Sequence, residues 1–272
     1  MVVVLAALPP SVTGTVVVTP AQMDGWAVDN GTCGAATTGS FTFVNGPATP
    51  PAGSGSVRFT VGANGDSYPT VRQGDYNGIK LSSLSALDYW TFVSASGSGA
   101  QAPYVNLYVD NNGDGVRDAI LAFEPMYQTA QGTVTVNTWQ HWDANNGLWW
   151  SGTPTPLFTL SSYVAARPDA RIVNVGGGGV ILAAGCGGAA WSNFVGNADK
   201  LTIGVSGSST TYDFETGSTP PAFTDEFLQP LSQSTDPANP VLNTGKNGRV
   251  IPVKVQISEG STGSPTRTRL AR

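Results

Sequence analysis

Short stretches in which apolar and polar residues alternate recur along the chain, and turn residues separate them. In the stretch 104–110, YVNLYVD, the residues Val105, Leu107 and Val109 occupy every second position. This period of two is that of a β-strand with two faces. A second apolar stretch, 119–126, follows the turn-rich segment DNNGDGVRD. The pattern therefore predicts an antiparallel hairpin over 104–127, with the acidic segment at its tip.

The same pattern predicts about ten to twelve strands in all. Beyond the hairpin they include 40–45, 57–61, 68–73, 79–81, 86–94, 133–136, 180–184, 200–205 and 210–214. One helix is expected near 160–167, with Thr159 or Ser161 as its N-cap and Pro168 at its end. Because parallel sheets need helical crossovers, a single helix favours antiparallel pairing. We expect an all-β fold, an antiparallel β-sandwich of the jelly-roll type with one short helix.

The chain divides into four predicted segments. Residues 1–14, MVVVLAALPPSVTG, are short, apolar and end in small residues, which is typical of a signal-peptide remnant cleaved after Gly14. Residues 15–215 form the sandwich, and 216–243, rich in Pro, Ser and Thr, form a linker. Residues 244–272 resume strand character but lack the apolar pattern to complete a domain, so a truncated second β-domain is expected.

Charged residues make up only 11% of the chain, and the net charge of −5 is uneven. Residues 1–244 carry 7 Lys/Arg and 17 Asp/Glu, whereas residues 245–272 carry 6 Lys/Arg and 1 Glu. The acidic body argues against nucleic-acid binding. No apolar stretch has the roughly 18 residues of a membrane span. Cys33 and Cys186 either pair in a disulfide, as expected in an exported protein, or remain separate thiols.

The hairpin tip has a spacing that predicts a calcium site. Asp110, Asn112, Asp114 and Asp118 occupy positions one, three, five and nine of a loop, and Val116 supplies a backbone carbonyl at seven. This spacing resembles the calcium loops of dockerins and thrombospondin type 3 repeats. The acid of an EF-hand at position twelve is absent. The alternative is an ordinary solvated turn, since Asn, Asp and Gly are also common turn residues.

Four of the seven tryptophans lie between residues 139 and 150 and predict a ligand-binding surface. Aromatic faces stack on sugar rings, and nearby polar side chains bind hydroxyl groups. The candidate residues are Trp139, Trp142, Asp143, Trp149 and Trp150. The alternative is that these rings pack in the core, because Trp149 and Trp150 must point to opposite faces of a strand.

The catalytic signals are sparse. His141 is the only histidine, and the chain lacks the G-x-S-x-G sequence of a serine hydrolase. A glycoside hydrolase needs two facing carboxylates, for which Glu124 with Asp143 or Glu215 is the available pair. We therefore expect a protein that is not an enzyme, with a glycan-acting hydrolase as an alternative.

Several segments are similar to β-sandwich modules of large secreted bacterial multidomain proteins. They include GSFTFVNGPATPPAGSGSVRF, LSALDYW, PYVNLYVD, TWQHWD, NADKLTIGV and TTYDFE, and they span 15–215. The resemblance implies a non-catalytic extracellular module. The segment NTGKNGRVIPVKVQI resembles the start of a PxKF-type domain, with Pro252, Val253 and Lys254 matching and Val255 in place of Phe. After Ser258 the resemblance ends, and a shifted or truncated reading frame is the expected origin of the basic tail.

These observations predict a secreted or cell-surface module for binding or adhesion, with carbohydrate as the leading ligand class and calcium as a stabilising ion. A structural spacer in a larger surface protein is the main alternative. Exposed tryptophans beside a groove favour binding, whereas buried tryptophans favour the spacer.

Overall fold

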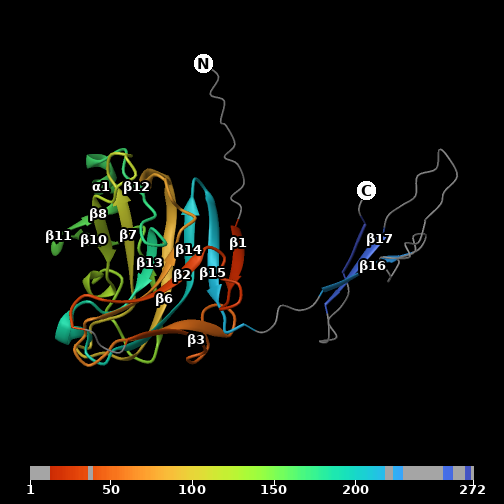
Figure 1. Cartoon of the computed structure of the whole chain (residues 1–272), viewed down its shortest axis with the longest axis horizontal. Helices are drawn as coiled ribbons and strands as arrows, with labels where there is room; N and C mark the ends of the chain where they lie inside the picture. The colour runs from red at the N-terminus through yellow and green to blue at the C-terminus, as the bar shows by residue number, and fades with distance from the viewer. Residues whose placement is uncertain (1–12, 36–38, 218–222, 229–253, 260–266, 271–272) are drawn as a thin grey trace, which may run out of the picture. The chain divides into compact units, whose positions relative to one another are not determined.

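The alternating stretches form two β-sheets that pack face to face. The computed structural model describes residues 13–35, 39–217, 223–228, 254–259 and 267–270. The chain divides into two units, Met1–Thr216 and Gly217–Arg272. The first unit is a β-sandwich with one short helix (Figure 1), so the predicted fold class is confirmed.

The first sheet has seven strands. They are β1 (Thr13–Val18), β3 (Ser40–Asn45), β4 (Gly55–Thr60), β6 (Leu84–Ala95), β9 (Trp139–Asp143), β14 (Val195–Val205) and β15 (Ser208–Phe214). All pairs are antiparallel except β1 with β15. The sheet branches at β14, whose first half pairs with β4 and whose second half pairs with β15, while β6 follows it along both halves.

A buried acid, Asp199, lies at the branch point of the sheet. The register of β14 against β6 shifts between Asp199 and Thr202, and Lys200 has a positive φ of 51°. There the Asp199 carboxylate accepts the backbone N–H of Phe214 and of Ala52, each at 3.1 Å. A side chain thus satisfies two donors at the point where β14 changes partners.

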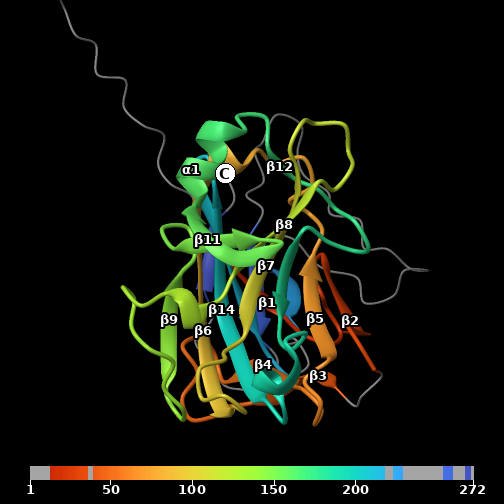
Figure 2. The same ribbon diagram turned by 90° about the vertical axis from the view of Figure 1, so that its left-hand side faces the viewer.

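The second sheet has eight strands. They are β2 (Trp26–Thr32), β5 (Ser67–Gln73), β7 (Tyr104–Asp110), β8 (Ala119–Phe123), β10 (Leu148–Ser151), β11 (Thr153–Thr159), β12 (Arg171–Ile172) and β13 (Val180–Ala183). Their order is β11-β10-β8-β7-β13-β5-β2, with β12 beside β7 (Figure 2). The predicted hairpin is β7 and β8, although β8 ends at Phe123 and a 3-10 turn, Pro125–Tyr127, follows it.

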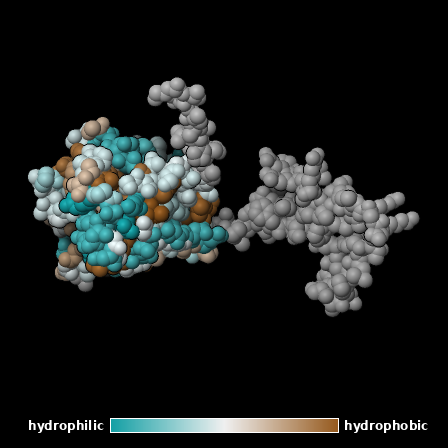
Figure 3. Space-filling model, turned by 90° about the horizontal axis from the view of Figure 1, so that it is seen from above, coloured by the Kyte–Doolittle hydropathy of each residue, from teal (hydrophilic) through white to brown (hydrophobic). Residues whose placement is uncertain are grey.

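The core lies between the sheets. Val105, Leu107 and Val109 are fully buried on the inner face of β7, as the alternation predicts. Tyr89 from the first sheet packs edge-on against Phe123 from the second, with ring centroids 6.1 Å apart. The surface seen in Figure 3 is mainly hydrophilic with scattered apolar patches, which agrees with a polar surface built largely from uncharged residues.

The helix α1 spans Leu160–Ala166 and lies at one end of the sandwich (Figures 1 and 2). Thr159 is its N-cap and accepts the backbone N–H of Ser162 at 3.2 Å, which confirms the first of the two predicted caps. Arg167 follows as the C-cap, and Pro168 comes directly after it, as predicted.

Two predicted strands are wrong. The stretch 79–81 is not a strand: Lys80 makes one bridge to Arg171, and a 3-10 helix begins at Leu81. The stretch 133–136 is not a strand either: Val136 makes a single bridge to Val93, and the Gln140 side chain accepts Thr135 N–H and donates to Thr133 C=O. Conversely, β11 is a strand that the pattern did not predict, since it contains Pro154 and Pro156. Prolines are tolerated there because β11 is an edge strand.

The predicted ends of the sandwich differ from those of the structure. Thr13 and Gly14 already belong to β1 and pair with Ser209 and Thr210, whereas the rest of the predicted signal segment lies outside the described residues. None of the helices in the described part of the chain has the length and apolar character to cross a membrane.

The second unit contains an antiparallel sheet in the order β16-β17-β18. These strands are Phe223–Leu228, Lys254–Glu259 and Arg267–Leu270. β16 lies within the predicted linker, and β18 lies in the tail in which the sequence showed no strand pattern. Lys254 and Val255 of the PxKF-like segment open β17, while Pro252 and Val253 lie outside the described residues.

A candidate ligand-binding groove

The outer face of the eight-stranded sheet is aromatic and polar. Because directly opposed residues share a face, Trp150, Ala122 and Asn106 lie abreast on β10, β8 and β7. Tyr104 and Tyr108 flank Asn106 on the same face of β7. All seven residues of β7 are buried, so the outer face of this strand is little exposed to solvent even though it faces away from the core.

A groove of about 750 Å³ lies over this face. Its aromatic lining comprises Tyr68, Tyr104, Tyr108, Tyr127, Trp150 and Trp191. Its polar lining includes Gln101, Asn106 and Glu124. This volume and this mixture of aromatic walls with a few polar groups are typical of small-molecule sites.

Two buried polar atoms in the groove walls have no full hydrogen bond among the described residues. Asn106 donates from Nδ2 to the Tyr68 hydroxyl at 2.9 Å, but its Oδ1 is buried without a donor among the described residues. The Trp150 Nε1 is likewise buried without an acceptor. An unpaired buried polar group costs about 1–3 kcal/mol of folding free energy. A ligand that forms a hydrogen bond with the group would remove that cost.

Glu124 lies at the end of β8 beside Trp150 and is half-buried. Burial raises the pKa of its carboxyl to about 7, and the nearby Trp150 indole partly opposes that rise. The indole N–H acts on this carboxylate as a donor, although the pair does not meet the geometry of a full hydrogen bond. Glu124 is therefore divided between its two protonation states near neutral pH.

The phenols of the groove remain protonated. Burial raises the pKa of Tyr68 to about 12 and holds that of Tyr104 well above its usual value. Their hydroxyls already have partners, since Tyr104 donates to the carbonyl of Gly185 at 3.1 Å. The Arg117 guanidinium lies 4.5 Å from the Tyr108 ring centroid, which fixes that ring at the edge of the site.

The disulfide forms one end of the groove. Cys33 and Cys186 are bonded, with their Cα atoms 5.3 Å apart, and both line the cavity. Of the two alternatives that the sequence left open, pairing is confirmed.

The tryptophan cluster predicted between residues 139 and 150 does not form a binding surface. Trp142 and Trp149 are fully buried and donate to Thr91 Oγ1 and to the carbonyl of Ala144, each at 2.8 Å. Trp139 belongs to the other sheet, where it donates to the carbonyl of Pro47 at 2.9 Å. The Asp143 carboxylate accepts from the backbone and side chain of Asn146.

Only Trp150 of that predicted set lines the groove. Trp139, Trp142 and Asp143 lie on β9, which belongs to the opposite sheet from β10. Trp149 shares β10 with Trp150 but points into the core. The groove residues that the site prediction missed include Tyr68, Tyr104, Asn106 and Tyr108. The sequence could have indicated them. The face of the strand opposite to Val105, Leu107 and Val109 consists of Tyr104, Asn106 and Tyr108, which are aromatic or polar.

The predicted hydrolase pairs are not brought together in the groove. Glu215 accepts the backbone N–H of Ser54 and of Gly55, in the turn between β3 and β4. Neither Glu215 nor Asp143 lines the groove with Glu124. His141 lies 3.2 Å from Asp88 on the first sheet.

The predicted calcium loop is a closed turn. Asp110 accepts the backbone N–H groups of Asn112, Gly113 and Gly115, and these bonds lower the pKa of its carboxyl against the effect of burial. Asp114 accepts from Val116, and Asp118 accepts from Asn111. Among the described residues, no group of three or more His, Cys, Asp or Glu side chains gathers closely enough to hold a metal ion.

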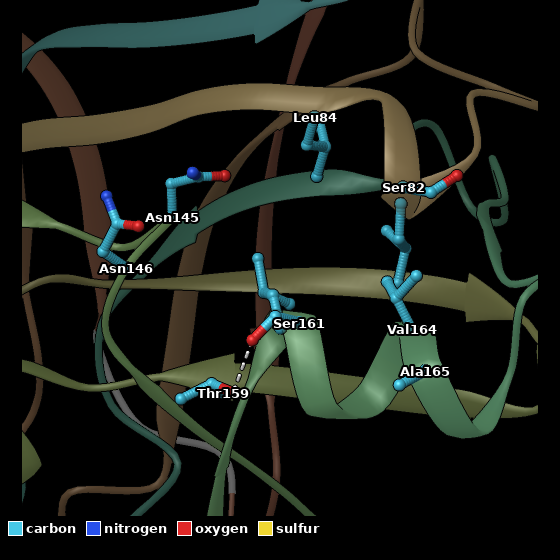
Figure 4. A pocket seen from close by; sticks show the side chains of 10 residues that line it. Ser82, Leu84, Asn145, Asn146, Thr159, Ser161, Val164 and Ala165 are labelled. Carbon is cyan, nitrogen blue, oxygen red and sulfur yellow. Dashed lines mark hydrogen bonds between the residues drawn. The ribbon is translucent and has the colours of Figure 1, made fainter.

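A second pocket, of about 520 Å³, lies beside α1 (Figure 4). Asn145 and Asn146 line it together with Ser82 and the hydroxyls of Thr159 and Ser161, which are 2.9 Å apart. It has no aromatic wall, and we therefore place the candidate site in the groove on the eight-stranded sheet.

No protein-family model matches the chain, and no curated protein matches it. A solved structure to which it is similar is the family 11 carbohydrate-binding module of the cellulosomal cellulase Lic26A-Cel5E of Clostridium thermocellum. The identity is 9% and the TM-score 0.36, and the match covers 66% of this chain and 88% of that chain.

Proposed function

We propose that the sandwich is a non-catalytic glycan-binding module and that the aromatic groove is its binding site. The observation that carries the proposal is an aromatic-walled groove whose walls hold polar atoms without a full hydrogen bond among the described residues. Aromatic rings pack against the C–H faces of sugar rings, and sugar hydroxyls both donate and accept hydrogen bonds.

A hydroxyl in the groove can donate to Asn106 Oδ1, and another can accept from Trp150 Nε1. Both atoms are shielded from solvent, so binding requires a small movement of the side chains that cover them. The pairing would relieve the cost of leaving these groups unpaired. We further propose that the module acts outside the cell or on its surface, in adhesion or attachment, which is consistent with its disulfide.

A matched pair of variants tests the site. Trp150→Ala removes a wall of the groove, whereas Trp139→Ala removes an equally half-buried ring from the other sheet. The full chain is applied to an array of neutral and acidic oligosaccharides, and the affinity of each bound glycan is measured by calorimetry. We expect about a tenfold or greater loss for Trp150→Ala and no comparable loss for Trp139→Ala.

A third variant distinguishes the contribution of the aromatic ring of Trp150 from that of its indole N–H. Trp150→Phe keeps an aromatic wall and is expected to weaken binding by about two- to tenfold. If the chain binds no glycan, the structural-spacer alternative is favoured. If Trp139→Ala rather than Trp150→Ala removes binding, the site lies on the seven-stranded sheet.

We also propose that Ca²⁺ binds the loop between β7 and β8. The support is its donor set: three carboxylates, the Asn112 amide and the Val116 carbonyl, all hard oxygen ligands. The carboxylate oxygens that accept loop N–H groups each keep a second lone pair for an ion.

Melting the full chain in calcium and in chelator tests this proposal. We expect a higher midpoint in calcium, and we expect Asp114→Asn to reduce that difference. Asp169→Asn, which alters an exposed ion pair with Lys80, serves as the control. Equal midpoints in the two buffers would mean that the loop is closed by its own backbone alone.

A further inference from the structure

The charge in the groove has one sign. Of the residues that line it, Asp118 and Glu124 are acidic, and none is Lys, Arg or His. Two cations near this face already have partners. Arg72 pairs with Asp29 at 2.7 Å, and the Arg117 guanidinium lies over the Tyr108 ring.

Glu124 is surrounded by uncharged groups. Its charge acts on Tyr89 of β6, Tyr104 of β7 and Tyr127 of the following 3-10 turn, and on each it raises the pKa. The remaining neighbour is the Trp150 indole of β10. The three phenols stay protonated at neutral pH, so none adds or removes charge there.

The Glu124 carboxylate has no counter-ion among the described residues, and the one donor that acts on it is the Trp150 indole. In contrast, a carboxylate oxygen of Asp118 accepts the backbone N–H of Asn111 at 2.7 Å, so Asp118 has a structural partner. Beyond the Trp150 indole, Glu124 therefore keeps acceptor sites for a group that enters the groove.

We propose that Glu124 determines the specificity of the groove, admitting uncharged glycans and rejecting those that carry carboxylate or sulfate groups. The proposal rests on the glycan-binding function proposed above. A hydroxyl of a neutral sugar donates to the Glu124 carboxylate, which is a stronger acceptor than a neutral oxygen. An anionic sugar would instead place a like charge beside an uncompensated carboxylate.

The preference for neutral over anionic glycans should depend on pH. Because the pKa of Glu124 is about 7, a growing fraction of the side chain is ionised as pH rises from 6 to 8. The anionic groups of uronates and sulfates are ionised throughout that range. Rejection of anionic glycans should therefore strengthen with pH in the wild-type chain, and it should be independent of pH once the carboxyl is removed.

The experiment compares the full chain with Glu124→Gln on one oligosaccharide array at pH 6 and pH 8. The probes are neutral cello-, xylo-, manno- and galacto-oligosaccharides together with homogalacturonan, alginate and heparan sulfate fragments. We expect the wild type to prefer neutral probes by about tenfold or more at pH 8. We expect the preference to shrink at pH 6 in the wild type and to be smaller and unchanged with pH in Glu124→Gln.

The outcomes distinguish failure of the proposed specificity from failure of glycan binding itself. Asp169→Asn removes a carboxylate outside the groove and should leave the preference unchanged. Equal or stronger binding of anionic probes by the wild type at pH 8 overturns the inference but leaves glycan binding intact. The same holds if Glu124→Gln retains the wild-type preference. Failure of every probe to bind overturns the proposed function and this inference with it.

Discussion

At the scale of single residues, the indole nitrogens between residues 139 and 150 separate structural tryptophans from the one in the groove. Trp139, Trp142 and Trp149 each donate to a protein oxygen. Trp150 does not, and it is the one of the four that lines the groove. A buried N–H whose partner is supplied by the fold stabilises the fold, and Trp150 combines an indole without such a full bond with a place in the groove wall.

Replacing Trp142 by Phe should destabilise the sandwich without affecting ligand binding. The variant leaves Thr91 Oγ1 without its donor and leaves a small cavity in a fully buried site. We expect a loss of about 1–3 kcal/mol in the free energy of unfolding, measured by denaturant titration. Trp90→Phe, at a half-buried ring, should lose less. A larger loss for Trp90→Phe would contradict the assigned role of Trp142.

At the scale of elements, β7 explains why one hairpin dominates the sequence pattern. Its inner face is wholly aliphatic and its outer face wholly polar or aromatic, so the alternation is strong. β11 shows the opposite case, since its two prolines and its exposed first four residues give no such alternation. Strands at an edge are held by one neighbour and carry a weaker pattern.

The cap of α1 can be tested by Thr159→Ala. This change removes the acceptor for the backbone N–H of Ser162 in a helix of only seven residues. The expected cost is about 1 kcal/mol, or a fall of roughly 2–4 °C in Tm. Ser161→Ala, two residues further along the chain, is the matched control because the Ser161 side chain accepts no backbone N–H of the described helix. Equal shifts for the two variants would contradict the assignment of Thr159 as the cap.

At the scale of the whole molecule, the disulfide joins segments that are 153 residues apart in sequence. Closing so long a loop restricts the unfolded chain strongly. We expect the double substitution Cys33→Ser with Cys186→Ser to cost about 2–4 kcal/mol, or roughly 5–15 °C in Tm. The comparison is a calorimetric scan of both forms under oxidising conditions, and unchanged melting would contradict the structural role of this bond.

The pH dependence of stability also belongs to the whole molecule, since it sums over three buried acids. Burial raises the pKa of Glu124 and of Asp199 to about 7 and that of Asp213 to about 6. For Asp213 the charge of Glu215 adds to that rise. The folded state therefore holds these protons more tightly than the unfolded state does.

Stability from these acids is fully present below their ordinary pKa values, near 4, and is lost as pH rises to about 7. We expect Tm to fall between pH 5 and pH 8 in thermal scans. Glu124→Gln should reduce that slope, whereas Asp169→Asn should not. A Tm that rises steadily over this range would contradict the raised pKa values.

The sequence by itself determined the strand period, the hairpin, the helix cap and the class of fold. These features depend on neighbours within a few residues, and alternation at Val105, Leu107 and Val109 reports a buried face directly. It left the pairing of Cys33 and Cys186 open, because the two residues are 153 positions apart in the chain.

Only the tertiary structure decided where the candidate site lies. Alternation shows that a strand has two faces, but it does not show what covers the second one. Trp149 and Trp150 differ by one position and point to the core and to the groove, respectively. The groove joins Tyr68, Asn106 and Trp150 from three separate strands, and their pairing depends on contacts between residues far apart in the chain. Such long-range pairing is fixed by the packing of the whole sandwich, which no local pattern records.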